Sequence, residues 1–249
     1  EIKDFPFDKY FVKKDNNRFD PYSLYALYAA HEAVANAGLE TEKLDSDRFG
    51  VILSTGIGGI KEIEEQVERM NDKGPKRIRP MALPKALPNM AAGNIAMAVG
   101  ANGVCKCVIT ACASSNDALG DAYREIKFGY QDVMLAGGAE AAITPFAIGG
   151  FQALTALSTT EDPARASIPF DKDRNGFVMG EGAGILVLES LEHAQKRGAT
   201  ILAEIVGYGN TCDAYHMTSP HPEGMGAIKA MKLAISEAGL EPADIDYIN

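Results

Sequence analysis

Short apolar segments alternate with segments of helical periodicity along the chain, and this alternation limits most strongly how the chain can fold. Four segments are almost continuously apolar: 50–56, 104–111, 132–138 and 184–189. Continuous apolar character is typical of strands buried on both faces, and helices between such strands indicate parallel connections. The sequence therefore predicts an α/β protein with a mostly parallel sheet that helices cover on both faces.

The order helix, stop and strand occurs twice. In the first copy, Asp20 is the expected N-cap, Pro21 takes the first helical position, and Gly38 is the expected stop before the first strand. The second copy has a helix, a stop at Gly239 and a strand predicted at 244–249. A four-residue segment is also identical in the two copies, as Ala37-Gly38-Leu39-Glu40 and Ala238-Gly239-Leu240-Glu241. This repetition predicts two related halves, of which the second is incomplete.

Charge and composition exclude several classes of function. Lys and Arg total 24 against 34 acidic residues, a net charge of −10, which would repel nucleic acid and anionic lipid. The chain has no run of about 18 apolar residues, so we expect no membrane partner. Four irregularly spaced cysteines are typical of reduced thiols and predict a cytoplasmic protein.

Two motifs imitate metal sites. The segment 171–176 resembles the start of a calcium loop, but Gly182 stands where that loop needs a bidentate Glu. Cys105 and Cys107 share one side of a predicted strand and lack a second ligand pair nearby in the sequence. We therefore expect no metal site.

Cys112 lies where a predicted buried strand gives way to a helix, among small residues. Backbone N–H groups at the start of a helix lower the pKa of a thiol, and they can also stabilise a developing oxyanion. A free cysteine is more often buried and inert. The local sequence alone therefore leaves both a nucleophilic and a structural role open.

The sequence around Cys112 resembles a motif of a known family. The segment Thr110-Ala111-Cys112-Ala113-Ser114-Ser115 resembles the nucleophile loop of the β-ketoacyl-(acyl carrier protein) synthases, the condensing enzymes of fatty-acid synthesis. Further segments that resemble this family, in the same order, are 56–59, 87–90, 137–140, 156–159, 169–177, 180–184 and 213–220. The likeness covers essentially the whole chain and is greatest to the elongating synthases of bacteria.

The resemblance implies a thiolase-like fold, with two similar βαβαβαββ halves layered α-β-α-β-α, which agrees with the repeat. We place the first half at residues 1–197 and the start of the second at 198–249. The first half then lacks its opening strand, and the second half is truncated.

The resemblance also implies the chemistry. Cys112 would be the nucleophile, and its backbone N–H an oxyanion donor; it would take an acyl chain from acyl carrier protein and condense it with malonyl-(acyl carrier protein) by a decarboxylative Claisen reaction. The family is homodimeric. It needs no cofactor of its own, because its substrates are bound covalently to the phosphopantetheine of the carrier. The implied acyl-chain positions are Ile57, Ala142, Ala147 and Phe151, the malonyl-pantetheine positions Thr218 and Ser219, and the carrier-docking positions Lys13, Lys14, Arg18, Lys76 and Arg77.

The chain departs from the family pattern in three places. The two histidines that activate malonyl decarboxylation, and a late Phe-containing glycine loop that supplies the second oxyanion donor, have no counterpart in it. We therefore expect the chain as given to be inactive in condensation.

Three alternatives remain open. A polyketide ketosynthase shares nearly every motif, and a non-catalytic partner subunit would bind acyl-(acyl carrier protein) without catalysis. Such subunits usually replace the nucleophile, so the presence of Cys112 argues against that role. Thiolase is disfavoured because the matching motifs belong to the carrier-dependent branch.

Overall fold

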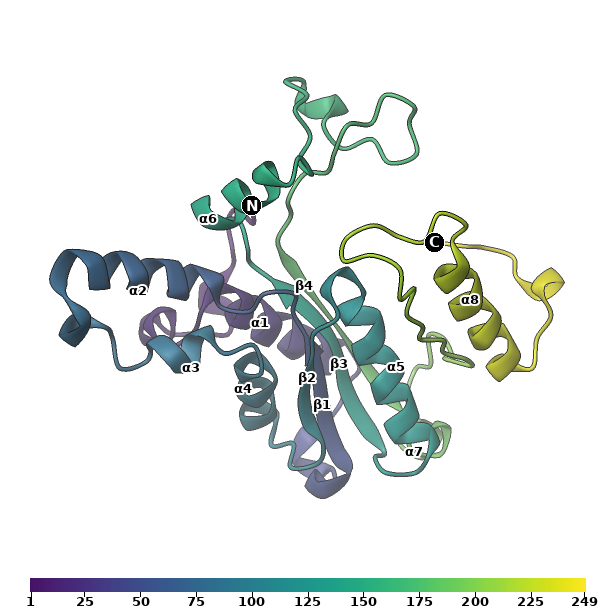
Figure 1. Ribbon diagram of the computed structural model, residues 1–249. Helices are drawn as coiled ribbons and strands as arrows, with labels where there is room; N and C mark the ends of the chain where they lie inside the picture. The colour runs from purple at the N-terminus through teal and green to yellow at the C-terminus, as the bar shows by residue number, and fades with distance from the viewer. The chain divides into compact units, whose positions relative to one another are not determined.

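The computed structural model describes all 249 residues, which form two compact units. The first unit comprises Glu1–Ser190 and the second Leu191–Asn249. Figure 1 shows the sheet and most helices in the first unit. No helix is long and apolar enough to cross a membrane.

A four-stranded sheet forms the centre of the first unit, in the order β2-β1-β3-β4. Strand β1 (Phe49–Ser54) is parallel to both β2 (Cys105–Val108) and β3 (Val133–Glu140), whereas β4 (Gly182–Glu189) is antiparallel to β3. Two of the three pairings are thus parallel, as predicted. The predicted burial is correct for β1 and β3 but wrong for β2 and β4, the two edge strands, neither of which contains a buried residue. The direction of β4 does not follow from its apolar sequence.

Helices cover both faces of this sheet (Figure 1). On one face, Val51 and Leu53 of β1 pack with residues of α1 (Pro21–Asn36) and α4 (Met90–Val99). On the other face, the intervening Ile52 packs against α5 (Ser114–Lys127). Alternate residues of one buried strand therefore contact opposite helical layers, which explains why the strand is continuously apolar.

Helix α1 begins and ends where the sequence predicts. The Asp20 side chain accepts a hydrogen bond from the Tyr22 N–H at 3.3 Å, and Pro21 occupies the first turn. After the helix, Gly38 has a φ of 58°, a left-handed conformation that glycine adopts with little strain. The buried Tyr22 hydroxyl then donates to the Leu87 carbonyl at 2.7 Å, which joins α1 to the segment before α4.

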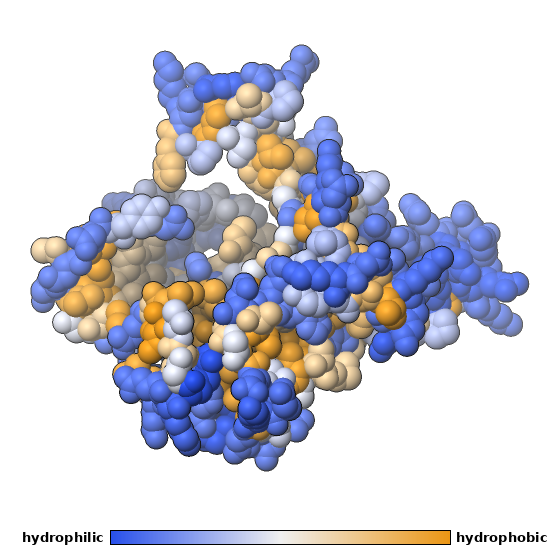
Figure 2. Space-filling model, turned by 180° about the vertical axis from the view of Figure 1, so that it is seen from behind, coloured by the Kyte–Doolittle hydropathy of each residue, from blue (hydrophilic) through white to orange (hydrophobic).

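Helices α2 (Ile60–Lys73), α3 (Ala82–Ala86) and α6 (Pro145–Ala153) complete the first unit. Hydrophobic patches interrupt the hydrophilic surface in the space-filling view of Figure 2. Among the exposed large apolar side chains, Leu83 is 73% and Met97 71% accessible. The surface of the first unit therefore has apolar as well as charged areas.

The second unit consists of α7 (Leu191–Lys196), α8 (Met225–Ala238) and irregular segments. Gly239 ends α8 in a left-handed conformation, as predicted. The strand predicted at 244–249 is wrong, because Pro242–Asp244 form a 3₁₀ turn and the following residues have no regular structure. A strand needs a neighbour for its backbone hydrogen bonds, and this unit contains no other strand.

Candidate active site

Cys112 lies in a tight turn between β2 and α5. The turn is a 3₁₀ helix of Ala111–Ala113, which follows the end of β2 and leads directly into Ser114 of α5. Ala111 has a φ of 51°, a left-handed conformation that is uncommon for a residue with a side chain and stores strain. The strained turn leaves the Cys112 side chain exposed at the N-terminus of α5.

The Ser114 hydroxyl fixes this turn. It donates a hydrogen bond to the Ala111 carbonyl at 2.6 Å and accepts one from the Thr110 N–H at 2.8 Å. The Ala113 N–H donates to the Thr110 carbonyl at 3.1 Å. These bonds occupy the N–H groups of Thr110 and Ala113 but not that of Cys112, which stays available for a ligand oxygen.

The turn borders a hollow of about 370 Å³. Its other walls are the carboxyl end of β1 (54–56), the end of β3 (138–140) and the start of β4 (182–184). Ligands of open α/β sheets commonly bind beyond the carboxyl ends of parallel strands. The hollow is therefore a suitable place for a substrate group beside the Cys112 thiol.

Glycine allows the parts of the site to approach closely. A Cβ atom on Gly138 would lie 2.2 Å from the Ser115 Oγ and 2.3 Å from the Ser54 Oγ. These two hydroxyls are themselves 3.0 Å apart and share a hydrogen bond. A side chain at position 138 would therefore have to displace the hydrogen-bonded Ser54 and Ser115 hydroxyls.

Glu140 is a site residue that the sequence analysis missed. Its carboxylate lines the hollow and accepts hydrogen bonds from the N–H groups of Gly56 at 2.7 Å and Ile57 at 3.2 Å and from the Thr55 hydroxyl at 3.2 Å. A glutamate at the end of a buried apolar strand was the available signal, although its partners lie about 85 residues earlier in the sequence. The carboxylate holds the loop after β1 in one shape.

The other two thiols of this region differ from Cys112. Burial raises the pKa of the Cys107 thiol, and partial desolvation also raises the pKa of Cys105, although much of the Cys105 side chain remains accessible. A raised pKa leaves less thiolate at neutral pH. Both thiols are thus less suited to nucleophilic attack than an ordinary exposed thiol.

The structure brings three of the four predicted acyl-chain residues together. Ile57, Ala142 and Ala147 belong to one apolar cluster with Ile60 and Met179. The fourth, Phe151, lies outside that cluster. Its ring packs edge-on against the Phe177 ring, with 5.2 Å between the ring centres.

The predicted malonyl-pantetheine residues, Thr218 and Ser219, lie in an exposed loop of the second unit. Their backbone N–H groups both donate to the Nδ1 atom of His216, each at 3.1 Å. The His216 ring thus accepts hydrogen bonds from the backbone of the loop that carries both residues.

The predicted carrier-docking residues form two exposed segments of the first unit. Lys13 and Lys14 belong to a 3₁₀ helix, Lys13–Asn17, and Arg18 follows it with an ion pair to Asp15 at 3.4 Å. Lys76 and Arg77 lie in a 3₁₀ turn, Pro75–Arg77, after α2. All five basic side chains are accessible to a partner.

Two family models match the chain. Residues 2–194 match the N-terminal domain of beta-ketoacyl synthases, and residues 202–249 match their C-terminal domain. The chain belongs to the beta-ketoacyl synthase family, which confirms the family predicted from the sequence.

Relatives and solved structures agree with this assignment. The chain is 47% identical to the 3-oxoacyl-[acyl-carrier-protein] synthase 2 of Synechocystis and to that of Staphylococcus aureus, across the whole chain but only 60% and 62% of those proteins. A beta-ketoacyl synthase from Burkholderia phymatum is 37% identical, with a TM-score of 0.87 over 98% of the chain and 59% of that structure. A polyketide ketosynthase, solved with its acyl-carrier protein, is 38% identical, with a TM-score of 0.89 over 96% of the chain and 60% of that structure.

These similarities confirm the thiolase-like ketosynthase fold. The chain spans about 60% of the length of the relatives that it matches. The division of the halves at residue 197 and the roles of the individual site residues stay predictions.

Proposed function

We propose that the protein is a β-ketoacyl-(acyl carrier protein) synthase of fatty-acid synthesis in which Cys112 carries the acyl group. The position of the Cys112 thiol supports this proposal most directly. The thiol is exposed on a strained turn at the start of α5, beside a hollow and next to an uncommitted N–H. The 47% identity to proteins named 3-oxoacyl-[acyl-carrier-protein] synthase 2 supports the substrate class.

In the first half-reaction, the Cys112 thiolate attacks the carbonyl carbon of an acyl thioester on the carrier. The oxyanion that forms accepts a hydrogen bond from the Cys112 N–H, while the N-terminus of α5 favours the negative charge. Collapse of the intermediate transfers the acyl group to Sγ, and the carrier thiolate leaves and takes up a proton.

In the second half-reaction, malonyl-(acyl carrier protein) loses carbon dioxide, and the resulting enolate carbon attacks the Cys112 thioester. This step forms the new carbon–carbon bond and releases the Cys112 thiolate. We assign it to the whole protein and not to the 249 residues alone. The four histidines present are His31, His193, His216 and His221.

The family resemblance assigns none of these four histidines to that step. The His31 ring stacks on Tyr10 with 4.9 Å between ring centres, and burial lowers its pKa. His193 belongs to α7, and the Nδ1 atoms of His216 and His221 accept backbone hydrogen bonds. We therefore propose that the chain accepts an acyl group but does not complete condensation.

The partner and assembly are part of the same proposal. An acyl carrier protein would dock on the basic segments at 13–18 and 76–77, and no cofactor beyond its phosphopantetheine is needed. Strand β2 is one of the two edges of the sheet, and a second copy pairing along this edge would give a homodimer. We place the protein in the cytoplasm, where carrier-bound substrates circulate freely.

A polyketide ketosynthase is the alternative that a specific observation favours, because one similar structure is such an enzyme with its carrier. Its 38% identity is lower than the 47% shared with the fatty-acid enzymes. The fatty-acid assignment therefore has the stronger support.

The test follows the two half-reactions separately. The chain is mixed with acyl-(acyl carrier protein) and malonyl-(acyl carrier protein), and free carrier thiol, carbon dioxide and β-ketoacyl product are each measured. We expect release of carrier thiol from the acyl donor, lost in Cys112→Ala and kept in Cys105→Ala, with no β-ketoacyl product. Equal release by wild type and Cys112→Ala would refute the proposed role of Cys112.

A further inference from the structure

A buried ion pair lies in the first unit away from the Cys112 hollow. Glu62, in the first turn of α2, pairs with Lys85 of α3, and their side chains are only 1% and 10% exposed. Separating the two members of a buried pair leaves unpaired buried charges, which is strongly destabilising. The pair therefore keeps α2 and α3 together. Neither residue belongs to a motif that the sequence connects with function.

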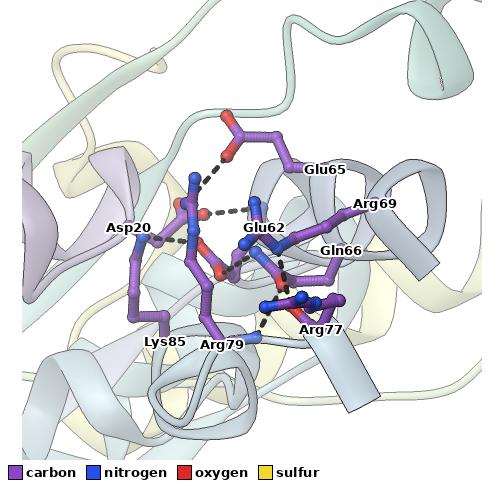
Figure 3. A network of polar contacts seen from close by, with 8 residues as sticks. All are labelled: Asp20, Glu62, Glu65, Gln66, Arg69, Arg77, Arg79 and Lys85. Carbon is purple, nitrogen blue, oxygen red and sulfur yellow. Dashed lines mark hydrogen bonds and ion pairs between the residues drawn. The ribbon is translucent and has the colours of Figure 1, made fainter. Parts of the chain in front are cut away.

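The pair belongs to a continuous chain of hydrogen bonds, drawn in Figure 3. The Glu62 N–H donates to the Asp20 carboxylate at 3.1 Å, and the Gln66 amide donates to the Glu62 carboxylate at 2.8 Å. The Gln66 side-chain oxygen then accepts the backbone N–H of Arg79 at 3.0 Å. Asp20, Glu62, Gln66 and Lys85, which we call the buried polar chain, thus connect the N-cap of α1 to the backbone of Arg79.

Each end of the buried polar chain is attached to a basic segment. Arg18 lies two residues before Asp20, and Lys76 and Arg77 lie just before Arg79. The Arg69 side chain makes a second hydrogen bond to this basic turn, because its Nε donates to the Arg77 carbonyl at 2.5 Å (Figure 3). Both basic segments are exposed in a protein whose net charge is −10.

A hollow of about 140 Å³ lies between the Arg18 segment and the start of α3. Arg18 and Asp20 line it from one side, and Met81 and Lys85 line it from the other. The Arg18 segment thus lies beside α3, and the basic turn at 76–77 is connected to it through the hydrogen bonds of Asp20, Glu62 and Gln66.

We propose that the buried polar chain holds the two basic segments at the separation that an acidic carrier protein requires, which makes Gln66 and Glu62 positioning residues for docking. This inference rests on the proposed carrier-docking function. Electrostatic complementarity between two surfaces depends on the fixed placement of their charges. A loose basic turn would lose conformational freedom on binding, and affinity would fall although every charge is still present.

The experiment uses Gln66→Leu, which removes both side-chain hydrogen bonds at similar volume and keeps the net charge. We expect the Kd for holo acyl carrier protein at low salt to rise about tenfold, because two hydrogen bonds that order the turn are lost. Gln131→Leu is the matched control, since Gln131 is the other buried glutamine and lies just before β3, away from both basic segments in the sequence. Its Kd should stay within about twofold of wild type, as expected for a site with no shared partner.

A second variant guards against a folding defect. Arg69→Lys keeps the charge at a surface site but loses the directed bond to the Arg77 carbonyl, and we expect the Kd to rise about threefold. Both variants are repeated in a Lys76→Glu, Arg77→Glu background. If the two residues act through the basic turn, their effects on Kd disappear in that background. If the substitutions instead disturb the fold in general, each raises the Kd further in that background by the same factor as in the wild type.

Each outcome has a separate meaning. An unchanged Kd in Gln66→Leu and Arg69→Lys, or an undiminished effect in the charge-reversed background, overturns the positioning role. An unchanged Kd after Lys76→Glu, Arg77→Glu alone shows instead that the proposed docking segment is wrong.

Discussion

The Glu140 carboxylate, at the end of β3, accepts the backbone N–H of Gly56 at 2.7 Å in the turn that follows β1. The same oxygen accepts the N–H of Ile57, so one carboxylate determines how an apolar residue of the predicted acyl-chain cluster is placed. Hydrogen bonds to a charged acceptor are stronger than those to a neutral one. The Glu140 carboxylate should therefore contribute substantially to the conformation of the loop after β1.

Glu140→Ala tests that influence. It leaves three donors without their acceptor, and we expect the free energy of unfolding to fall by about 3 kcal/mol. Glu140→Gln keeps one acceptor oxygen and should lose roughly 1 kcal/mol. Urea unfolding measures both variants.

The acyl-chain profile provides a second readout of Glu140. If Glu140 places Ile57, Glu140→Ala changes the relative rates of acyl transfer from short-chain and long-chain donors, while Glu140→Gln keeps the wild-type order. An identical order in all three proteins would show that the loop after β1 does not depend on this carboxylate.

Ser114 is expected to control the turn that presents the nucleophile. Ser114→Ala removes the hydroxyl that bonds Thr110 and Ala111, so the strained turn should relax and the rate of acyl transfer should fall about tenfold. Ser115→Ala is the comparison, because the Ser115 hydroxyl bonds Ser54 and does not hold the turn. Equal rates in the two variants would contradict the role given to Ser114.

Cys112 is expected to be the most reactive thiol. Burial raises the pKa of Cys105 and Cys107, which lowers their thiolate fraction, whereas Cys112 lies exposed at the start of a helix. Limited alkylation with iodoacetamide at neutral pH, followed by peptide mass spectrometry, should label Cys112 first. Earlier labelling of Cys105, Cys107 or Cys212 in folded protein argues against it.

Asp20 should make stability depend on pH. Desolvation raises its pKa in the folded protein to about 6, against an ordinary value near 3.8. The folded state then binds the proton more tightly than the unfolded state, so this contribution is complete at low pH and is lost as the pH rises through 6. Between pH 5 and 7.5 it should decrease by about 1.4 kcal/mol.

Asp20→Asn provides the comparison, because it removes the titrating group and keeps a side-chain acceptor for the helix N-terminus. Urea unfolding of both proteins across pH 5 to 7.5 gives the difference in the free energy of unfolding. The stability of Asp20→Asn relative to the wild type should increase as the pH rises. A constant difference would mean that Asp20 does not titrate in this range.

The sequence predicted the features that depend on local pattern. The positions of the four strands, the start of α1 at Asp20 and the turn at Cys112 follow from apolar runs, capping residues and small residues. The accessibility of β2 and β4 did not follow, because a strand's place at the edge of a sheet is not a local property. The antiparallel direction of β4 did not follow, since an apolar run has no direction. The strand predicted at 244–249 failed because strand formation depends on a neighbour that no local pattern reveals.

Polar contacts between distant segments were also beyond the sequence. Glu140 meets the turn after β1, and Glu62 meets Lys85, only because the fold brings these residues together. Phe151 was grouped with the acyl-chain residues by resemblance, whereas its own contact is with Phe177. Charged residues in a sequence usually indicate a solvated surface, so the few that are buried cannot be recognised before the packing is known.

Formation of an acyl-enzyme on Cys112 is the most direct test of the nucleophilic role proposed for this residue. The chain is incubated with acyl-(acyl carrier protein), digested under acidic conditions that preserve thioesters, and analysed by peptide mass spectrometry. We expect the acyl mass on the peptide that contains Cys112, at close to one group per chain, and no acyl mass on the Cys112→Ala variant. An acyl group found on Cys105, Cys107 or Cys212, or an unmodified Cys112 peptide after complete exposure to the donor, would contradict it.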